Sequence, residues 1–192
     1  PQVQRRWKDL RGGGVWQDLG PHLIDQVLLL FGLPQSIVAD LAVHTPGRPA
    51  FDYAHVQLRY ERLRVLVHIS QSTPTSGLRF AVHGTRGCYI KHGLDAQEDQ
   101  SKAGMKPGDS RWGLDPVDGQ LLRVAGESVA EAVTVPNERG RYLAYYAAVL
   151  DALRGAGPNP VPPEQALAVM SVLEAGLASA REGRPVQLAT IR

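Results

Sequence analysis

Three polar residues near the start of the chain have the types and the spacing for acid–base chemistry. Asp18, His22 and Asp25 follow one another at intervals of four and three residues, so on a helix they share one narrow face. A carboxylate beside an imidazole favours the protonated ring and fixes its orientation, which suits a general acid/base. The same stripe is also typical of the solvated face of an amphipathic helix, where an Asp–His pair is only a weak surface contact.

A metal site is the third interpretation of the same residues. Asp18 and His22 could both ligate a cation, but two ligands without a third nearby are poor evidence for a metal centre. The single cysteine, Cys88, excludes an internal disulfide and a cysteine-based zinc site. We therefore predict no metal, and a metal bound at Asp18 and His22 would overturn that prediction.

The residues around this stripe predict the helix that must position it. Apolar residues recur at helical spacing from residue 15 to residue 31, and Gly32 followed by Pro34 marks the end of the helix. Pro21 either begins the helix or kinks it. The triplet Gly12-Gly13-Gly14 lies just before it, and glycines without Cβ atoms would let a ligand or another backbone approach closely.

The rest of the chain predicts an α+β domain with an open, mostly antiparallel sheet and helices packed on one face. Alternating apolar and polar residues indicate strands at 36–44, 52–60, 64–70, 77–83, 88–92, 121–124, 128–135 and 186–188. Helices are expected at 141–154 and 163–182, and residues 93–119 form a long polar excursion. The second and third strands form a hairpin, across which His55 and His68 could meet; these two histidines could instead lie at a subunit contact. We treat residues 1–192 as a single domain.

Composition excludes several classes of protein. The chain has 192 residues and a net charge of +2, without the clustered Lys and Arg of a nucleic-acid-binding protein. Its longest apolar run, Val27–Phe31, is far shorter than the roughly 20 residues that span a bilayer. We expect a cytoplasmic protein that binds neither nucleic acid nor membrane.

The segment from Gly12 to Gln26 resembles a motif of the Gfo/Idh/MocA family, whose members are NAD(P)-dependent oxidoreductases of sugars, polyols and related compounds. The family pattern is a glycine pair, then an aspartate, then a histidine four residues later, and it opens a helix of the C-terminal domain. The segments 31–34, 83–87 and 172–186 are similar to further parts of that domain. The resemblance covers nearly the whole chain and implies the dihydrodipicolinate-reductase/glyceraldehyde-3-phosphate-dehydrogenase-like C-terminal fold.

The resemblance implies a role for each candidate residue. His22 would exchange the proton of the substrate hydroxyl while the nicotinamide takes or returns hydride. Asp18 would bind the substrate or orient the histidine. Trp7 and Trp16 flank the glycine loop and are substrate-binding candidates because an aromatic ring can stack on a sugar; Trp16 points to the apolar side, which favours the core instead. Asp25 is the last substrate-binding candidate, with a structural role in anchoring the helix as its alternative.

The resemblance also defines what this chain lacks. No Gly-x-Gly-x-x-Gly stands between a strand and a helix, and the family's Glu-Lys-Pro lysine belongs to the absent N-terminal half. We therefore expect the C-terminal fragment of a longer enzyme, inactive alone, whose NAD or NADP binds elsewhere in the parent. The open sheet face would pair into a homo-oligomer. The alternative is a non-catalytic binding or assembly protein, against which the retention of Asp18 and His22 speaks.

Overall fold

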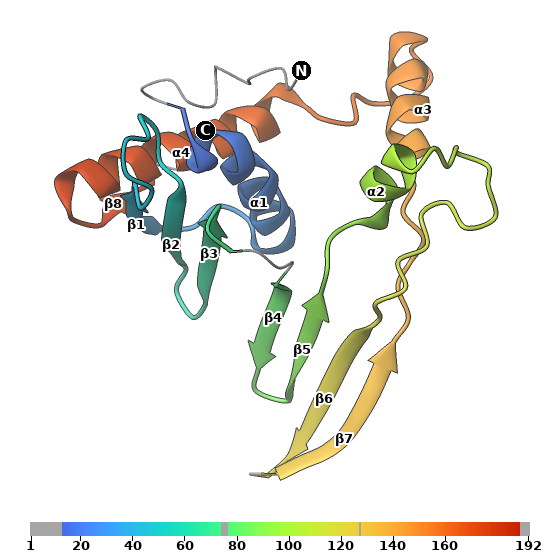
Figure 1. Cartoon of the computed structure of the whole chain (residues 1–192), viewed down its shortest axis with the longest axis horizontal. Coiled ribbons are helices and arrows are strands. Elements are labelled where there is room, and N and C mark those ends of the chain that lie inside the picture. Colours follow the sequence, from blue (N-terminus) through green and yellow to red (C-terminus); the bar gives the residue numbers. More distant parts are fainter. Residues whose placement is uncertain (1–12, 74–76, 127, 189–192) are drawn as a thin grey trace. The chain divides into compact units, whose positions relative to one another are not determined.

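The computed structural model describes residues 13–73, 77–126 and 128–188. They belong to two compact units, Pro1–Pro74 with Val161–Arg192 and Thr75–Pro160, each built around a four-stranded sheet (Figure 1). The α+β class is confirmed, and all pairings between the labelled strands are antiparallel. The sequence suggested a single sheet, but the strands form two. In the described residues no ladder of hydrogen bonds joins the third strand to the fourth.

The first unit is a sheet with two helices. Its sheet has the order β3-β2-β1-β8. The elements are α1 (Val15–Phe31), β1 (Ser36–Ala42), β2 (Tyr53–Arg59), β3 (Arg64–Ser70), α4 (Pro163–Glu182) and β8 (Val186–Gln187). Each lies where hydrophobic periodicity predicts it, within one or two residues at most ends.

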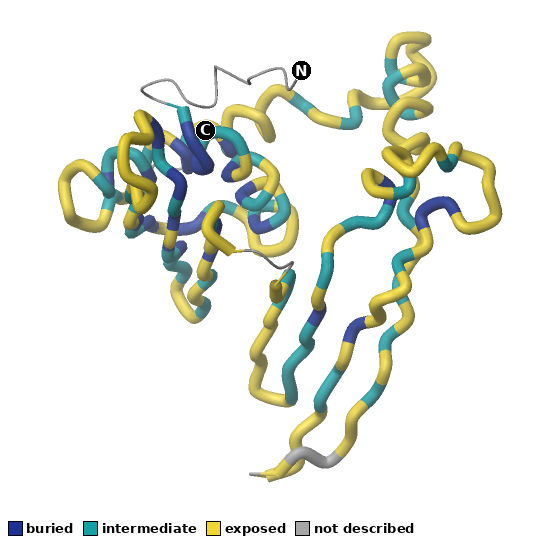
Figure 2. Tube along the Cα trace, in the orientation of Figure 1, coloured by how far each residue is buried: buried dark blue, intermediate teal, exposed yellow. Residues whose placement is uncertain are grey.

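The hydrophobic core of the chain lies in this unit, between the helices and one face of the sheet. Strand residues alternate between core and solvent: in β2, Ala54, Val56 and Leu58 are completely buried, whereas the neighbouring His55 is exposed. Buried stretches of the trace, in dark blue, occur in both the strands and the helices of this unit (Figure 2). The helices contribute the other half of the core. Its buried members are Val15, Trp16, Ile24, Val27, Ile37, Ala39, Ala54, Val56, Leu58, Val67, Ile69, Val169, Val172 and Leu173. Among the described residues of this unit, helices pack on one face of the sheet and leave the opposite face open.

The end of α4 is joined to the sheet by a buried serine. Ser179 Oγ accepts a hydrogen bond from the amide of Ala39 in β1 (3.1 Å) and donates one to the carbonyl of Arg184 (2.8 Å). Gly183 ends the helix with φ +62°, and its amide donates to the Ser179 carbonyl. Gly183 is thus the C-cap of α4, and a single hydroxyl connects the helix, the turn after it and the sheet.

The second unit is an antiparallel meander with two helices. Its sheet has the order β4-β5-β6-β7. The elements are β4 (Leu78–Gly84), β5 (Gly87–His92), α2 (Ala96–Lys102), β6 (Gly119–Ala125), β7 (Ser128–Val135) and α3 (Tyr142–Leu153). The short helix α2 falls inside the excursion 93–119 and has no apolar periodicity that could predict it.

Hydrophobic burial in this second unit is sparse. Among the side chains described there, Trp112 is the one apolar side chain in the buried class, at 8% exposure. The apolar helix α3 has no buried residue, and Tyr146 and Leu153 are 66% and 81% exposed. Such a sheet and helix expose apolar surface that soluble domains normally cover.

None of the helices in the described residues is both long enough and apolar enough to cross a bilayer.

Candidate active site

The start of α1 is fixed by a close approach of two backbones. Gly14 bridges Phe51 in a parallel contact, and the amide of Val15 donates to the Phe51 carbonyl at 2.8 Å. Gly14 has φ +105°, and a Cβ on it would overlap the backbone of Phe51. Of the two partners that the glycine triplet could admit, another backbone is the one found at Gly14.

A buried aspartate holds the loop that carries Phe51. Asp52 is 1% exposed and accepts hydrogen bonds from the amides of His44 (2.7 Å) and Thr45 (2.9 Å). A side-chain hydrogen bond from Thr45, the His44 amide and the Thr45 amide together outweigh desolvation and lower the pKa of Asp52 to about 2. Sequence reasoning placed this residue only at the start of a strand. The signal that could have found it is an aspartate closing a turn that contains Pro46 and Gly47.

The other end of α1 is fixed as well. Gly32, with φ +72°, caps the helix through its amide, which donates to the Leu28 carbonyl at 2.9 Å. Its own carbonyl accepts the hydroxyl of Tyr60 at 2.8 Å. Burial raises the pKa of Tyr60 to about 12, so this hydroxyl keeps its proton as a donor throughout the physiological range. The helix is continuous through Pro21, so the proline lies inside it and does not begin it.

Trp16 lies in the core. Its ring is completely buried, and its indole N–H donates to the carbonyl of Leu173 on α4 at 3.0 Å. Two glycines make room for the ring: a Cβ on Gly20 of α1 or on Gly176 of α4 would crowd it. This is the core alternative that the sequence left open for Trp16, and the buried ring has no surface to offer a substrate. Trp7, the other aromatic candidate, lies outside the described residues.

The opposite side of α1 carries the predicted acid–base residues. Asp18 is partly buried, and His22 and Asp25 are exposed, so the structure brings these three residues to one helix face and leaves the imidazole accessible. The carbonyl of His22 accepts a hydrogen bond from the side chain of Gln26 at 2.6 Å. Chemically, this face can bind hydroxyl groups and exchange a proton at His22. The individual roles of the three residues stay predictions.

The face is not uniformly polar. Leu29 follows Asp25 by four residues, so it continues the same stripe, and it is 81% exposed. Leu19 and Leu30 beside the stripe are 41% and 58% exposed. Charged and polar side chains normally dominate a helix face that meets only water. The exposed leucines therefore favour a surface that faces a ligand or another part of a larger protein.

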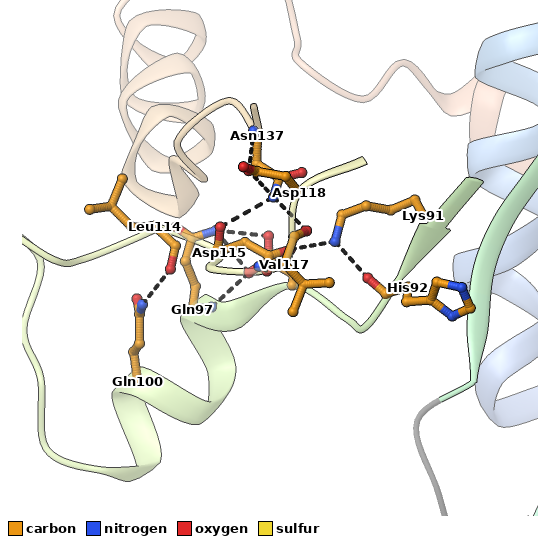
Figure 3. A network of polar contacts seen from close by, with 10 residues as sticks. Lys91, His92, Gln97, Gln100, Leu114, Asp115, Val117, Asp118 and Asn137 are labelled. Carbon is orange, nitrogen blue, oxygen red and sulfur yellow. Dashed lines mark hydrogen bonds and ion pairs between the residues drawn. The ribbon is translucent and has the colours of Figure 1, made fainter. Parts of the chain in front are cut away.

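A polar network organises the excursion 93–119 in the second unit (Figure 3). Lys91, which is 5% exposed, forms an ion pair with Asp115 at 2.8 Å and also donates to the His92 carbonyl. Burial alone would raise the pKa of Asp115, but hydrogen bonds from Lys91 and from the Val117 amide lower it. Asn137 closes the network by donating to the Val117 carbonyl at 2.7 Å.

Two glutamines of α2 extend this network. The buried Gln97 accepts the amide of Tyr142 at 2.9 Å and donates to the carboxylate of Asp95. Gln100 accepts the amide of Gly113 and donates to the carbonyl of Leu114. The side-chain amides of Gln97 and Gln100 hold α2 through hydrogen bonds in place of the apolar contacts that it lacks. The excursion is therefore an ordered segment that hydrogen bonds stabilise.

The same geometry bears on cofactor and metal binding. A dinucleotide site needs parallel strands with a glycine-rich turn into a helix, and in the described ranges the labelled strands pair only in antiparallel fashion. The described residues therefore do not form a dinucleotide site of the Rossmann type. No cluster of three or more metal-ligating side chains occurs in the part of the chain that the structure describes.

Comparison with known proteins agrees with this geometry. Residues 1–188 match the family model described as "Oxidoreductase family, C-terminal alpha/beta domain" of the Gfo/Idh/MocA group. The chain is 46% identical to the uncharacterized oxidoreductase YdgJ of Escherichia coli and 35% identical to scyllo-inositol 2-dehydrogenase (NADP(+)) IolW of Bacillus subtilis, in both cases over 98% of its length. A solved Yersinia pestis structure, of a protein assigned as an oxidoreductase, superposes on the whole chain with a TM-score of 0.91 at 40% identity.

The matches also show how much of each relative this chain represents. It spans 55% of YdgJ, 53% of IolW and 54% of the Yersinia pestis chain, so it corresponds to about half of each of these proteins. The family model that it matches describes the C-terminal half. The chain belongs to the Gfo/Idh/MocA oxidoreductase family, of which it is a C-terminal domain.

Proposed function

We propose that this chain supplies the substrate-binding and acid–base part of an NAD(P)-dependent dehydrogenase that acts on a sugar, a polyol or a related hydroxy compound. The observation that carries the proposal is the face of α1, a helix held at Gly14 and at Gly32, with His22 exposed one turn after Asp18. A rigid helix keeps an acid–base group within the narrow geometry that catalysis needs. The exposed leucines on and beside this face favour a ligand-facing role over a solvated one.

The chemistry assigned to the chain is proton exchange. In the oxidation of a carbinol, the His22 imidazole would take the hydroxyl proton, and a nicotinamide bound by another part of the parent would supply the hydride acceptor. Carbonyl reduction runs the same transfers backwards, so protons and electrons balance in both directions. Asp18 accepts a hydrogen bond from the substrate or from the imidazole, and Asp25 adds an acceptor on the same face.

The substrate class and cofactor rest on one relative. IolW is a scyllo-inositol dehydrogenase that uses NADP. We therefore put a polyol forward as substrate and NADP as the first cofactor to test, with NAD second. A cytoplasmic location belongs to the same proposal, and the free thiol of Cys88 is consistent with a reducing compartment.

We further propose that copies of the parent associate through sheet surface that is open in the single chain. In the first unit the helices leave one sheet face open, and in the second unit apolar side chains such as Val82 and Leu78 are 43% and 55% exposed. Covering such surface is the usual reason for subunit association, and an ordinary interface buries roughly 800 Å² per partner. Size-exclusion chromatography with light scattering tests this part separately from the chemistry.

The experiment for the chemistry uses the full-length parent. The purified protein is supplied with scyllo-inositol and with a panel of polyols and sugars, each with NADP and with NAD, and formation of reduced nicotinamide is followed by absorbance. We expect turnover with at least one polyol. Binding of a polyol without any reduced nicotinamide would favour the non-catalytic binding protein and overturn the proposal.

A further inference from the structure

A cavity lies in the second unit, where the excursion meets the start of α3. Its volume is about 440 Å³, within the range of roughly 300–1,000 Å³ that is usual for small-molecule sites. The residues that line it lie within the segments 107–112 and 139–144. None of these lining residues belongs to a strand, so the cavity is formed apart from the sheet surface proposed for subunit association.

Backbone contacts join the two segments that line the cavity. The amide of Gly140 donates to the Gly113 carbonyl at 2.8 Å, and the guanidinium of Arg139 donates to the Ser110 carbonyl at 2.9 Å. Gly113 has φ +74°, and a Cβ on it would overlap the carbonyl oxygen of Gly140, so the two backbones lie in close contact. The cavity is therefore shaped before a ligand enters, which lowers the entropic cost of binding.

Positive charge predominates among the side chains that line the cavity. Arg139 and Arg141 contribute two guanidinium groups, against the single carboxylate of Asp109. Arg139 donates through Nη2 to the Ser110 carbonyl, and the side chain of Arg141 makes no hydrogen bond or ion pair within the part of the chain that the structure describes. A guanidinium presents several N–H donors in a planar fork that matches the oxygens of a carboxylate or a phosphate. The cavity therefore suits an acidic group.

The other lining side chains suit the rest of a polar ligand. Asp109 accepts the amide of Lys106 through Oδ2 at 2.7 Å, and a carboxylate has further lone pairs that can accept ligand hydroxyl groups. Trp112, which is 8% exposed, and Leu143, which is 55% exposed, add apolar surface. Apolar side chains beside a few polar groups are typical of sites that hold the carbon skeleton of a small molecule.

We propose that this cavity binds a small hydroxylated organic acid, a sugar acid or a sugar phosphate. Its acidic group binds to Arg139 and Arg141, and one of its hydroxyl groups donates to Asp109. A carboxylate and a phosphate share the chemistry that the two guanidinium groups recognise. The site goes beyond the proton exchange proposed for α1, because it belongs to the other compact unit and uses none of the acid–base residues.

The test titrates the full-length parent by calorimetry with gluconate, with glucose 6-phosphate and with neutral glucose. We expect saturable binding of at least one acidic probe, and the tighter of the two distinguishes a carboxylate ligand from a phosphate ligand. Glucose should bind at least about tenfold more weakly, and Arg141→Gln should weaken binding of the acidic probe by a similar factor. Arg111→Gln is the matched control, because Arg111 is an exposed neighbour that does not line the cavity, and it should bind as the unsubstituted protein does.

Two further measurements locate the binding. The acidic probe should change the tryptophan fluorescence of the unsubstituted protein, and Trp112→Phe should remove that change. Binding should persist in His22→Asn, which separates this site from the acid–base face of α1. Equal binding by Arg141→Gln and the unsubstituted protein, or no binding of either acidic probe, would overturn the proposal. Inorganic phosphate that binds as tightly as the acidic probes would overturn it as well, since the hydroxylated skeleton would then contribute nothing.

Discussion

The backbone of Phe51 occupies the space that a side chain on Gly14 would need. The two residues form a parallel bridge, and the Phe51 carbonyl accepts the first amide of α1. The start of the helix that presents His22 is therefore positioned by a residue that lies 37 positions after Gly14 in the sequence. Asp52, next to Phe51, holds that loop through two backbone amides.

Gly14→Ala should lower the free energy of unfolding of the first unit by more than the strain of a positive φ alone would. The substitution combines a positive φ with an overlap against backbone, so we expect a loss of at least about 2–3 kcal/mol in the free energy of unfolding. Urea denaturation measures it. Gly32→Ala is the matched control, because Gly32 also has a positive φ but nothing within 4 Å of a Cβ; it should cost only about 1–2 kcal/mol. Equal losses for the two variants would show that the contact with Phe51 does not constrain residue 14.

Trp16→Phe distinguishes the core role from substrate stacking. The variant loses the hydrogen bond to the Leu173 carbonyl and part of a buried ring, so stability should fall by about 1–3 kcal/mol. In the full-length parent KM for the substrate should stay unchanged, because the ring is completely buried. A raised KM at unchanged stability would restore Trp16 as a substrate-binding residue.

The lowered pKa of Asp52 predicts that the first unit loses stability in acid. Its folded-state pKa of about 2 lies below the usual value of 3.8, so its contribution is complete above about pH 4 and is lost as the pH falls toward 2. Asp52→Asn should be less stable at neutral pH and should show a flatter decline between pH 4 and pH 2. Thermal melts of both proteins across this range measure the difference. Parallel curves would mean that the carboxylate is not linked to folding.

How much of this could be predicted from the sequence depends on the range of the interactions involved. The helix α4 and the hairpin of β2 and β3 follow local periodicity and turn residues, and they were predictable to within a residue. The face shared by Asp18, His22 and Asp25 follows from helical spacing for the same reason.

The parts that could not be predicted depend on contacts between distant residues. Nothing in the sequence near Phe51 indicates that its carbonyl accepts the amide of Val15. The helix α2 has no apolar stripe that could predict it, and it is held instead by hydrogen bonds that join Gln97 and Gln100 to backbone groups distant in the sequence. The division of the strands into two sheets is likewise set by which strands pair. The alternation of apolar and polar residues within a strand does not indicate which strand lies next to it.

The buried ion pair of the second unit gives a further test of how the excursion is held. Lys91→Met leaves the largely buried Asp115 carboxylate without its cation, with the Val117 amide as a remaining donor. The free energy of unfolding should fall by about 3 kcal/mol, toward the lower end for buried pairs because some solvent reaches the carboxylate. Hydrogen exchange in residues 112–119 should accelerate accordingly. Lys102→Met removes an exposed ion pair with Glu98 and should cost less than about 0.5 kcal/mol. Similar exchange in the two variants would contradict a stabilising role for the buried pair.

The most direct test of the proposed function is the turnover of His22→Asn in the full-length parent. Loss of the acid–base group should lower kcat by about 10²–10⁴-fold, while the melting temperature stays unchanged because the side chain is exposed. Gln26→Ala, on the same helix, serves as a control and should retain most of the activity. A folded His22→Asn enzyme with undiminished kcat would contradict the assignment of proton exchange to α1.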